Sequence, residues 1–353
     1  MNIIHFYPLS NRPNGIKTVL EELSRWQKIA GNIVTIYSIR SGNEYECVNT
    51  PQKFINEIEK KSPDIVVFHS LYFPIYIPFA FILRCKKIPY LIQLHGALSE
   101  QNYKKNYFKK KLSNILCFNK FLKGANSIIY LNENEYKKSI VKNINPQCTI
   151  IPNGCNNVIN LNPRNIQNER PISIVYLGRI AKIHKGLDLL LQAITYLRNN
   201  EMQNKVRFEF YGNGHKQEIE WFVEQISTLS DIAQFKGVVM GDSKDRVLRE
   251  ADLFILTSRY EGMPMGVLEA LSYGLPCILT YETNMAEEIS KAKAGWITSL
   301  NPEDIAKTIM AAVEETHNEY PILRNNALNL SRKYNWLTIA EESVIKYRES
   351  THV

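Results

Sequence analysis

Short apolar runs alternate with amphipathic segments along most of the chain. Between the first two runs, the segment 16–30 repeats its apolar residues with a helical period. Strands that alternate with such helices form βαβ units, in which helices bury both faces of a parallel sheet. The first half of the chain is therefore predicted to be a parallel α/β domain over 1–160. Its predicted strands are 3–7, 34–39, 65–68, 90–94, 127–131 and 148–152.

A segment rich in Asn and Pro, 153–171, interrupts this pattern and is typical of a linker. The alternation then restarts, with predicted strands at 172–178, 206–212, 252–258 and 275–280. At 353 residues the chain is long enough for two domains with separate cores. We therefore expect two doubly wound parallel-sheet (Rossmann-like) domains facing a cleft, 1–160 and 171–335. A last helix, within 336–353, is available to pack back on either domain.

The stretch 65–83 has no charged residue and is long enough to cross a bilayer. His69, Ser70, Pro74 and Pro78 interrupt it, so a buried strand, a turn and a core helix explain it better. The six cysteines are scattered without a CxxC pair, which indicates neither a disulfide framework nor a zinc site. No signal peptide is recognisable at the start, and a reducing cytoplasm is expected.

The formal net charge of +8 raises the question of nucleic acid as a partner. The excess is local, because residues 101–132 contain seven lysines and no acidic residue. Nucleic acid is therefore not expected. As a helix, 103–123 would carry apolar residues on one face and lysines beside it. Such a face could pack on the core or contact an anionic membrane, where each well-placed lysine contributes about 1 kcal/mol.

Polar residues follow the second-half strands at the edge of the sheet where ligands bind in such folds. Arg179 follows the strand at 172–178, and Lys185 comes six residues later. Two cations beside a glycine-rich turn suit a diphosphate that no metal neutralises. The alternative is that both cations form surface ion pairs.

Metal and dinucleotide sites are not indicated. The sequence has no D-x-D pair and no cluster of His, Asp and Glu with ligand spacing, so we expect neither a metal nor a cofactor. The turn Gly212-Asn213-Gly214 lacks the rest of a G-x-G-x-x-G fingerprint, which disfavours a dinucleotide dehydrogenase.

Two carboxylates, Glu261 and Glu269, lie eight positions apart in "EGMPMGVLEALSYG". A helix that begins near Pro264–Met265 would direct its free N–H groups and the positive end of its dipole toward a ligand. Gly262 would let a ligand approach the backbone closely. The carboxylates could accept hydrogen bonds from sugar and ribose hydroxyls, which favours a nucleotide sugar. Alternatively, Glu269 is a solvated helix residue and Glu261 an exposed loop residue.

These motifs together resemble the retaining nucleotide-sugar glycosyltransferases of family 4, which have the two-domain GT-B fold. The E-x7-E motif is matched by Glu261 and Glu269, and the similarity covers nearly the whole chain. Its other motifs are "LGRIAKIHKGLDLLLQAI" (177–194), "FYGNG" (210–214), "IIPNG" (150–154) and "LHG" (94–96). The chain is similar to members that assemble bacterial surface polysaccharides.

The resemblance implies a role for each matching residue. Arg179 and Lys185 would hold the diphosphate and stabilise the leaving nucleotide in place of a metal. Glu269 would bind the ribose, while Glu261 would hold the donor sugar together with backbone groups. His95 would lie near the anomeric centre, unless it is a core histidine. The remaining implied substrate-binding residues are Asn14 and Gly15 in the first domain, and Gly212, Asn213, Gly214, Gly262, Met263, Pro264 and Met265 in the second.

The implied reaction is transfer of a sugar, with retention at the anomeric carbon, from a nucleotide diphosphate sugar to a hydroxyl of a glycan or lipid-linked acceptor. A UDP-sugar is preferred, because no side chain is recognisable as a guanine selector. A lipid-linked acceptor in surface polysaccharide assembly would explain the lysine segment and would place the enzyme on the inner face of the cell membrane. The alternatives are a sugar-nucleotide epimerase of similar architecture and a non-catalytic nucleotide-sugar-binding protein.

Overall fold

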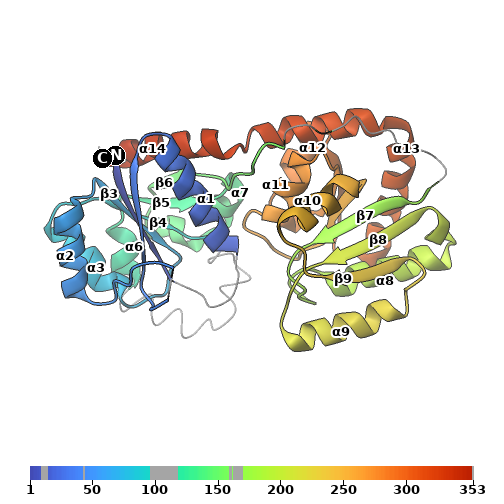
Figure 1. Ribbon diagram of the computed structural model, residues 1–353, viewed down its shortest axis with the longest axis horizontal. Coiled ribbons are helices and arrows are strands. Elements are labelled where there is room, and N and C mark those ends of the chain that lie inside the picture. The colour runs from blue at the N-terminus through green and yellow to red at the C-terminus, as the bar shows by residue number, and fades with distance from the viewer. Residues whose placement is uncertain (9–14, 43, 96–117, 159–160, 162–169, 352–353) are drawn as a thin grey trace. The chain divides into compact units, whose positions relative to one another are not determined.

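The computed structural model describes residues 1–8, 15–42, 44–95, 118–158, 161 and 170–351 (Figure 1). The chain folds into two compact units. Unit 1 consists of residues 1–154 together with 336–353, and unit 2 consists of residues 155–335.

Unit 1 is built on a six-stranded parallel sheet in the order β2-β1-β3-β4-β5-β6. Its strands are β1 (Asn2–Tyr7), β2 (Ile33–Ser38), β3 (Ile65–His69), β4 (Tyr90–Gln93), β5 (Ser127–Tyr130) and β6 (Cys148–Ile150). Its helices are α1 (Gly15–Ile29), α2 (Pro51–Lys61), α3 (Tyr76–Cys85), α6 (Asn119–Lys123), α7 (Glu133–Lys138), a 3₁₀ turn (Ile140–Asn143) and α14 (Trp336–Thr351). The strands β1, β3 and β4 are consecutive in this parallel order, so their carboxyl ends lie side by side.

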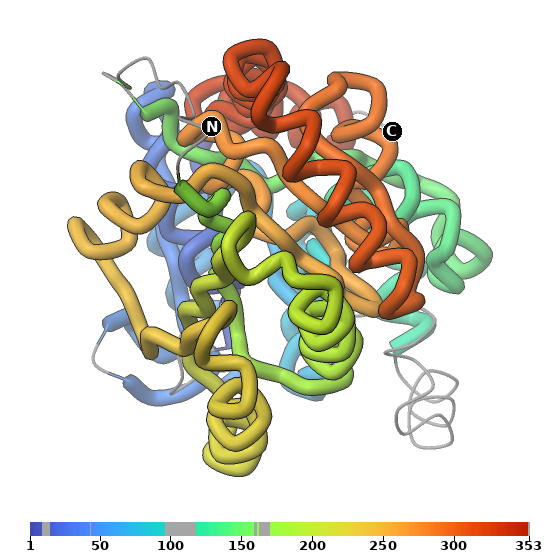
Figure 2. The backbone as a smooth tube through the Cα atoms, turned by 90° about the vertical axis from the view of Figure 1, so that its right-hand side faces the viewer, coloured from blue at the N-terminus to red at the C-terminus, as the bar shows by residue number. Residues whose placement is uncertain are grey.

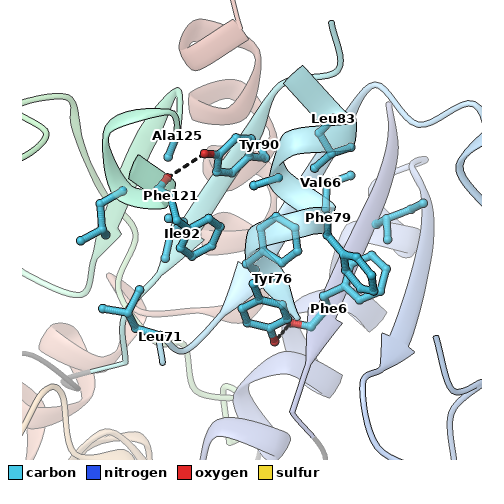
Figure 3. Packing of buried hydrophobic residues seen from close by; sticks show 14 of the residues in the cluster. Phe6, Val66, Leu71, Tyr76, Phe79, Leu83, Tyr90, Ile92, Phe121 and Ala125 are labelled. Atoms are coloured by element: carbon cyan, nitrogen blue, oxygen red, sulfur yellow. Dashed lines mark hydrogen bonds between the residues drawn. The ribbon is translucent and has the colours of Figure 1, made fainter. Parts of the chain in front are cut away.

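One face of this sheet carries an aromatic core (Figure 3). Phe6 of β1 packs against Phe54 and Phe79, whose rings stack with centroids 4.0 Å apart. The hydroxyl of Tyr90 donates a hydrogen bond to the backbone oxygen of Phe121 at 2.7 Å, so this polar group is satisfied inside the core. On the unit's other side α14 packs along α1, although some 300 residues separate them in sequence.

Unit 2 has a second six-stranded parallel sheet in the order β12-β11-β10-β7-β8-β9. Its strands are β7 (Ile172–Leu177), β8 (Val206–Tyr211), β9 (Ala233–Gly237), β10 (Leu253–Leu256), β11 (Cys277–Thr280) and β12 (Gly295–Thr298). Its helices are α8 (Leu187–Asn199), α9 (Lys216–Ser227), α10 (Gly241–Glu250), α11 (Met265–Ser272), α12 (Ala286–Ala292) and α13 (Pro302–Arg332), with 3₁₀ turns at Met202–Asn204 and Tyr281–Thr283. The long α13 packs against α8, α11 and β12 (Figure 2).

The two doubly wound sheets confirm the predicted fold class. Every strand predicted from the sequence is present, with each end within two residues of the prediction. The uncharged stretch 65–83 forms β3 and most of α3, as expected for a buried strand followed by a core helix. Within the ranges that the structure describes, no helix is long and apolar enough to span a bilayer. Most of the lysine segment lies outside the described residues, which include only its last part, with α6.

Candidate active site

The sheet of unit 2 has a switch point between β7 and β10. From β7 the chain builds β8 and β9 on one side, and then crosses to build β10, β11 and β12 on the other. The loops that follow β7 and β10 therefore leave the sheet in opposite directions, and a crevice between such loops is the usual ligand site of an open α/β sheet. In this chain the two loops are 178–186 and 257–264.

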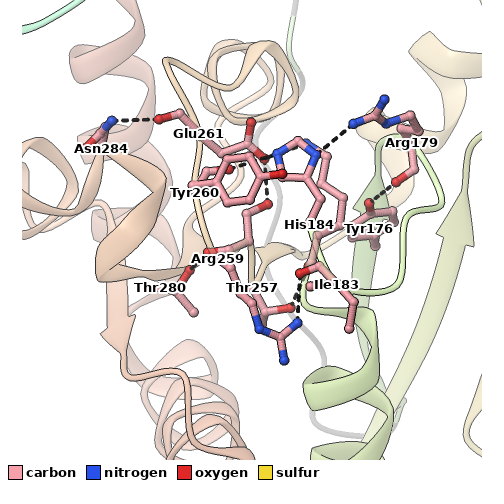
Figure 4. Close-up of polar contacts among 12 residues, drawn as sticks. Tyr176, Arg179, Ile183, His184, Thr257, Arg259, Tyr260, Glu261, Thr280 and Asn284 are labelled. Carbon is pink, nitrogen blue, oxygen red and sulfur yellow. Dashed lines mark hydrogen bonds and ion pairs between the residues drawn. The ribbon is translucent and has the colours of Figure 1, made fainter. Parts of the chain in front are cut away.

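Arg179 in the first of these loops is held by His184 (Figure 4). The guanidinium Nη2 of Arg179 lies 2.7 Å from Nδ1 of His184, and Nε2 of His184 lies 2.9 Å from the backbone oxygen of Tyr260. Because a carbonyl only accepts, the His184 proton is on Nε2 and Nδ1 accepts from Arg179. The His184 ring also stacks on Tyr260, with centroids 4.2 Å apart. Burial lowers the pKa of His184 to about 4, so the ring is neutral near pH 7.

Lys185 and Glu261 form an ion pair across the switch point. Nζ of Lys185 lies 2.5 Å from Oε1 of Glu261, and the hydroxyl of Ser258 donates to the same oxygen at 2.6 Å. The side chains of the pair are only 13% and 11% exposed, so solvent screens the interaction weakly. Burial raises the pKa of Glu261, but the charge of Lys185 and the two hydrogen bonds outweigh it, so the net shift is downward. Glu261 is therefore a carboxylate at neutral pH.

A second ion pair fixes the backbone around these groups. Arg259 binds Asp188 at the start of α8 through two contacts of 2.7 Å, and also donates to the backbone oxygen of Ile183 at 2.8 Å. Gly186 has a left-handed backbone (φ +63°), and a Cβ there would lie 2.0 Å from the backbone oxygen of Thr257. Only glycine lets the two loops approach this closely.

The turn at Gly212–Gly214 packs against the loop after β7. A Cβ at Gly212 would lie 1.8 Å from the Gly178 oxygen, and the backbone N–H of Ile180 donates to the Asn213 oxygen at 2.7 Å. Close packing between backbones thus accounts for the glycines at 212 and 214 independently of any ligand. The side chain of Asn213 accepts from the backbone N–H of Gly214 at 2.8 Å, and the residue is exposed.

The helix α11 begins at Met265, where the sequence predicted it, with Pro264 as N-cap. The proline has no side-chain group to cap the first N–H groups, and no acidic residue lies in the first turn. Before it, Gly262 and Met263 form a bend, and Met263 is buried. Glu269 lies one turn into the helix and is paired with Lys244 of α10 at 2.8 Å, with both side chains partly exposed.

In unit 1, His95 lies two residues beyond the end of β4 and is partly exposed. Its φ of +51° is a left-handed conformation, which is uncommon for a residue with a side chain. Its Nε2 lies 2.8 Å from Nδ1 of the buried His69. Gly15 is the exposed first residue of α1, and Asn14 lies outside the described residues.

The structure therefore brings Arg179, Lys185 and Glu261 together around His184, and places Glu269 in a separate ion pair. The sequence alone does not indicate His184, although it lies next to Lys185, because one of its two contacts is the backbone oxygen of Tyr260, 76 positions away. Nor does it indicate Ser258 or Lys244. Across the part of the chain that is described, no group of three or more His, Cys, Asp or Glu residues could hold a metal ion.

Comparison with known proteins shows which proteins this chain is similar to. Residues 171–315, most of unit 2, match the family model described as "Glycosyl transferases group 1". Mannosylfructose-phosphate synthase from Agrobacterium fabrum is 26% identical over 48% of this chain and 38% of that relative. GDP-mannose:cellobiosyl-diphosphopolyprenol alpha-mannosyltransferase from Komagataeibacter xylinus is 28% identical over 50% of this chain and 45% of that relative. This chain thus aligns with less than half the length of these two relatives.

The fold extends the similarity to the whole chain. The crystal structure of HepE from Anabaena in complex with UDP-glucose superposes with a TM-score of 0.75 at 15% identity, covering 99% of this chain and all of that one. The family match over residues 171–315 thus shows a group 1 glycosyltransferase domain in unit 2, and the likeness to HepE shows that the whole chain has the two-domain GT-B fold.

Proposed function

We propose that this protein transfers a sugar from a nucleoside diphosphate sugar to a hydroxyl group of a glycan or lipid-linked acceptor, with retention at the anomeric carbon. The observation that carries the proposal is the cluster of Arg179, Lys185 and Glu261 at the switch point of unit 2. Two cations beside one ionised carboxylate match a ligand that has a diphosphate next to hydroxyl groups. UDP is the preferred nucleotide, because HepE of the same fold binds UDP-glucose.

In this proposal Arg179 and Lys185 bind the diphosphate and stabilise the charge that develops on the leaving nucleotide. His184 keeps Arg179 in place by accepting its hydrogen bond. Lys185 is already paired with Glu261, so a bound diphosphate would share this cation with the carboxylate. The first N–H groups of α11, with the backbone at Gly262 and Met263, would complete the donor site together with Gly212, Asn213 and Gly214, and Glu269 would bind the ribose.

No metal is needed in this proposal, because the two cations supply the positive charge. The metal-free reading can be tested directly. Addition of EDTA should leave turnover essentially unchanged. Activity that EDTA abolishes and magnesium or manganese restores would show that the cations do not replace a metal.

From unit 1 we propose that His95, Gly15 and Asn14 complete the site, with His95 near the anomeric centre. We also propose that the lysine segment 103–123 holds the enzyme peripherally on the inner, cytoplasmic face of the membrane. The Komagataeibacter xylinus relative, whose printed name specifies a diphosphopolyprenol acceptor, supports a lipid-linked acceptor in surface polysaccharide assembly.

The membrane claim has its own test. Replacement of Lys104, Lys105, Lys109, Lys110 and Lys111 by Ser should release the protein from anionic vesicles, while transfer to a soluble acceptor analogue persists. Binding of the unmodified protein should also weaken as salt increases. If the unmodified protein fails to sediment with anionic vesicles at low salt, the membrane role is wrong and the transferase proposal stands without it.

An assay of donor turnover separates the proposal from its two rivals. Incubation of UDP-glucose and other nucleotide sugars should release nucleotide rapidly only when a lipid-linked or glycan acceptor is added. An epimerase would act on the nucleotide sugar without an acceptor. A non-catalytic binding protein would show only a thermal shift with the nucleotide sugar, since ligand binding stabilises the folded state by mass action.

A further inference from the structure

Three histidines form a continuous hydrogen-bonded chain across the sheet of unit 1. Nδ1 of His5 lies 2.8 Å from Nε2 of His69, and Nδ1 of His69 lies 2.8 Å from Nε2 of His95. They come from β1, from the end of β3 and from the position just beyond β4, which are neighbours in the sheet. His5 and His69 are completely buried, whereas His95 is partly exposed.

His5, at the buried end of this series of histidines, is held in place by residues of two helices. Nε2 of His5 lies 3.0 Å from Oε1 of Gln27 on α1, and Nε2 of Gln27 donates to the hydroxyl of Ser343 on α14 at 2.9 Å. The Ser343 hydroxyl in turn donates to the backbone oxygen of Ala340 at 2.7 Å. Because that proton is already used, Ser343 accepts from Gln27, and this orients the Gln27 amide with its oxygen toward His5.

This orientation of the Gln27 amide determines which ring nitrogen of each of the three histidines carries the proton. An amide oxygen only accepts, so His5 carries its proton on Nε2 and has a bare Nδ1. His69 must then donate from Nε2 and accept at Nδ1, and His95 must donate from Nε2. The last ring is left with an unprotonated Nδ1.

The rings also remain neutral. Protonation of His5 or His69 on both nitrogens would set two N–H groups against each other at 2.8 Å. Burial, the main cause, lowers the pKa of His5 to about 4 and that of His69 well below its usual value. Burial likewise lowers the pKa of His95, to about 3.

We propose that Gln27, Ser343, His5 and His69 are positioning residues that hold His95 as the neutral Nε2–H tautomer, with Nδ1 as a hydrogen-bond acceptor for a hydroxyl of the bound sugar. The functional part rests on the proposed function, which places His95 at the donor sugar. The left-handed backbone of His95 fits such a role, because strained residues persist where the surroundings fix them and they gather at functional sites. The C-terminal helix α14 thereby contributes to the site through Ser343, without contact to the sugar.

We call the hydrogen-bonded series from Ser343 through Gln27, His5 and His69 to His95 the relay. Nuclear magnetic resonance of the full-length protein labelled with ¹⁵N in its histidines tests this relay without any activity measurement. Long-range ¹H–¹⁵N correlation distinguishes the two neutral tautomers and the imidazolium, and single His→Gln variants assign the signals. At pH 7 we expect His5, His69 and His95 all to be protonated on Nε2 alone. A His95 protonated on Nδ1, or a cationic His95, would overturn the relay.

Substitutions of Ser343 and Gln27 test whether these two residues set the position of the protons on the three histidines. Ser343→Ala removes the acceptor that orients Gln27, so a second, Nδ1–H form of His95 should appear. We expect kcat to fall about tenfold, the lower end of the loss seen when a hydrogen bond that orients a metal-ligating histidine is removed. Adding Gln27→Glu should restore a single Nε2–H form, because a carboxylate can only accept. Ser24→Ala is the matched control, since Ser24 is a buried serine of α1 whose hydroxyl has no hydrogen-bond partner among the described residues.

The outcomes separate the relay from the proposed function. If Ser343→Ala gives the same tautomer as Ser24→Ala, the relay is wrong whatever the activity. If the tautomers behave as expected but no acceptor ever supports sugar transfer, the relay stands and the proposed function fails. Melting temperatures of the variants show whether each one is folded when its spectrum is recorded.

Discussion

Acidification from pH 7 to pH 5.5 should destabilise unit 1 much more than unit 2. The cause is the buried histidine chain, in which the pKa values of His5, His69 and His95 are all lowered. In the unfolded chain each of these histidines titrates near pH 6.5. The unfolded state therefore binds more protons as the pH falls through 6.5, and the folded state, with its depressed pKa values, binds almost none. The stability that the three neutral histidines contribute is therefore fully present above pH 6.5 and is lost progressively as the pH falls below it.

The magnitude follows from proton linkage. For a histidine that stays neutral in the folded state, the change from pH 7 to pH 5.5 costs about 1.3 kcal/mol. Three such histidines cost about 4 kcal/mol, which is a large part of the 5–15 kcal/mol that stabilises a typical domain. Among the residues of unit 2 that the structure describes, one histidine is comparable: His184, whose pKa burial lowers to about 4. Its expected loss is about 1.3 kcal/mol, roughly a third as much.

Hydrogen exchange with mass spectrometry can measure both losses in one sample, with each rate corrected for the intrinsic effect of pH. A two-domain protein is not a two-state system, so local opening free energies are the appropriate quantity. Peptides from β1 and β3 report on unit 1, and peptides from β7 and β8 report on unit 2. Equal losses in the two units, or a loss below about 1 kcal/mol in unit 1, would refute the assignment of three neutral buried histidines.

Three further predictions concern the candidate site. In calorimetry, Glu269→Ala should weaken the binding of nucleotide and nucleotide sugar alike, whereas Glu261→Ala should weaken the binding of the nucleotide sugar only. Equal losses of affinity for both ligands in both variants would show that the carboxylates have no separate roles. Arg179→Ala should lower turnover by about two to three orders of magnitude, the cost of losing one donor to a developing charge, and a change below fivefold would contradict its role. Gly186→Ala should destabilise the protein by at least about 2 kcal/mol in urea denaturation, since its Cβ would collide with a backbone oxygen at a left-handed position. Gly15→Ala, whose Cβ would meet no atom within 4 Å, is the control and should leave stability nearly unchanged.

The sequence was sufficient for the α/β architecture because the hydrophobic pattern is a local property. Each central strand is an apolar run with a helix pattern beside it, and the parallel pairing follows from that alternation. The strands that the sequence reasoning missed, β9 and β12, both lie at the edges of the unit 2 sheet. Edge strands are partly exposed, and "AQFKG" and "GWIT" accordingly lack the continuous apolar run of a central strand.

The E-x7-E motif and its cations could also be recognised from sequence, because they lie in short segments with a fixed spacing. What the sequence could not give is how these charges are paired. Lys185 and Glu261 are 76 positions apart, and only the crossing of the sheet at β7 and β10 puts their side chains in contact. The sequence indicates Glu261 only as a ligand for sugar hydroxyls, and the structure adds a cation, Lys185, as its partner.

The histidine chain depends on tertiary structure throughout. His5, His69 and His95 have no common spacing, and each alone resembles an ordinary core histidine. Their rings meet because β1, β3 and β4 are neighbours, and their protons are ordered because α14 returns to pack on α1, placing Ser343 beside a glutamine 316 positions earlier. A hydrogen bond requires two atoms about 3 Å apart, and these atoms can belong to residues far apart in the sequence. The pattern of hydrophobic and polar residues, in contrast, indicates only which side of each segment is buried.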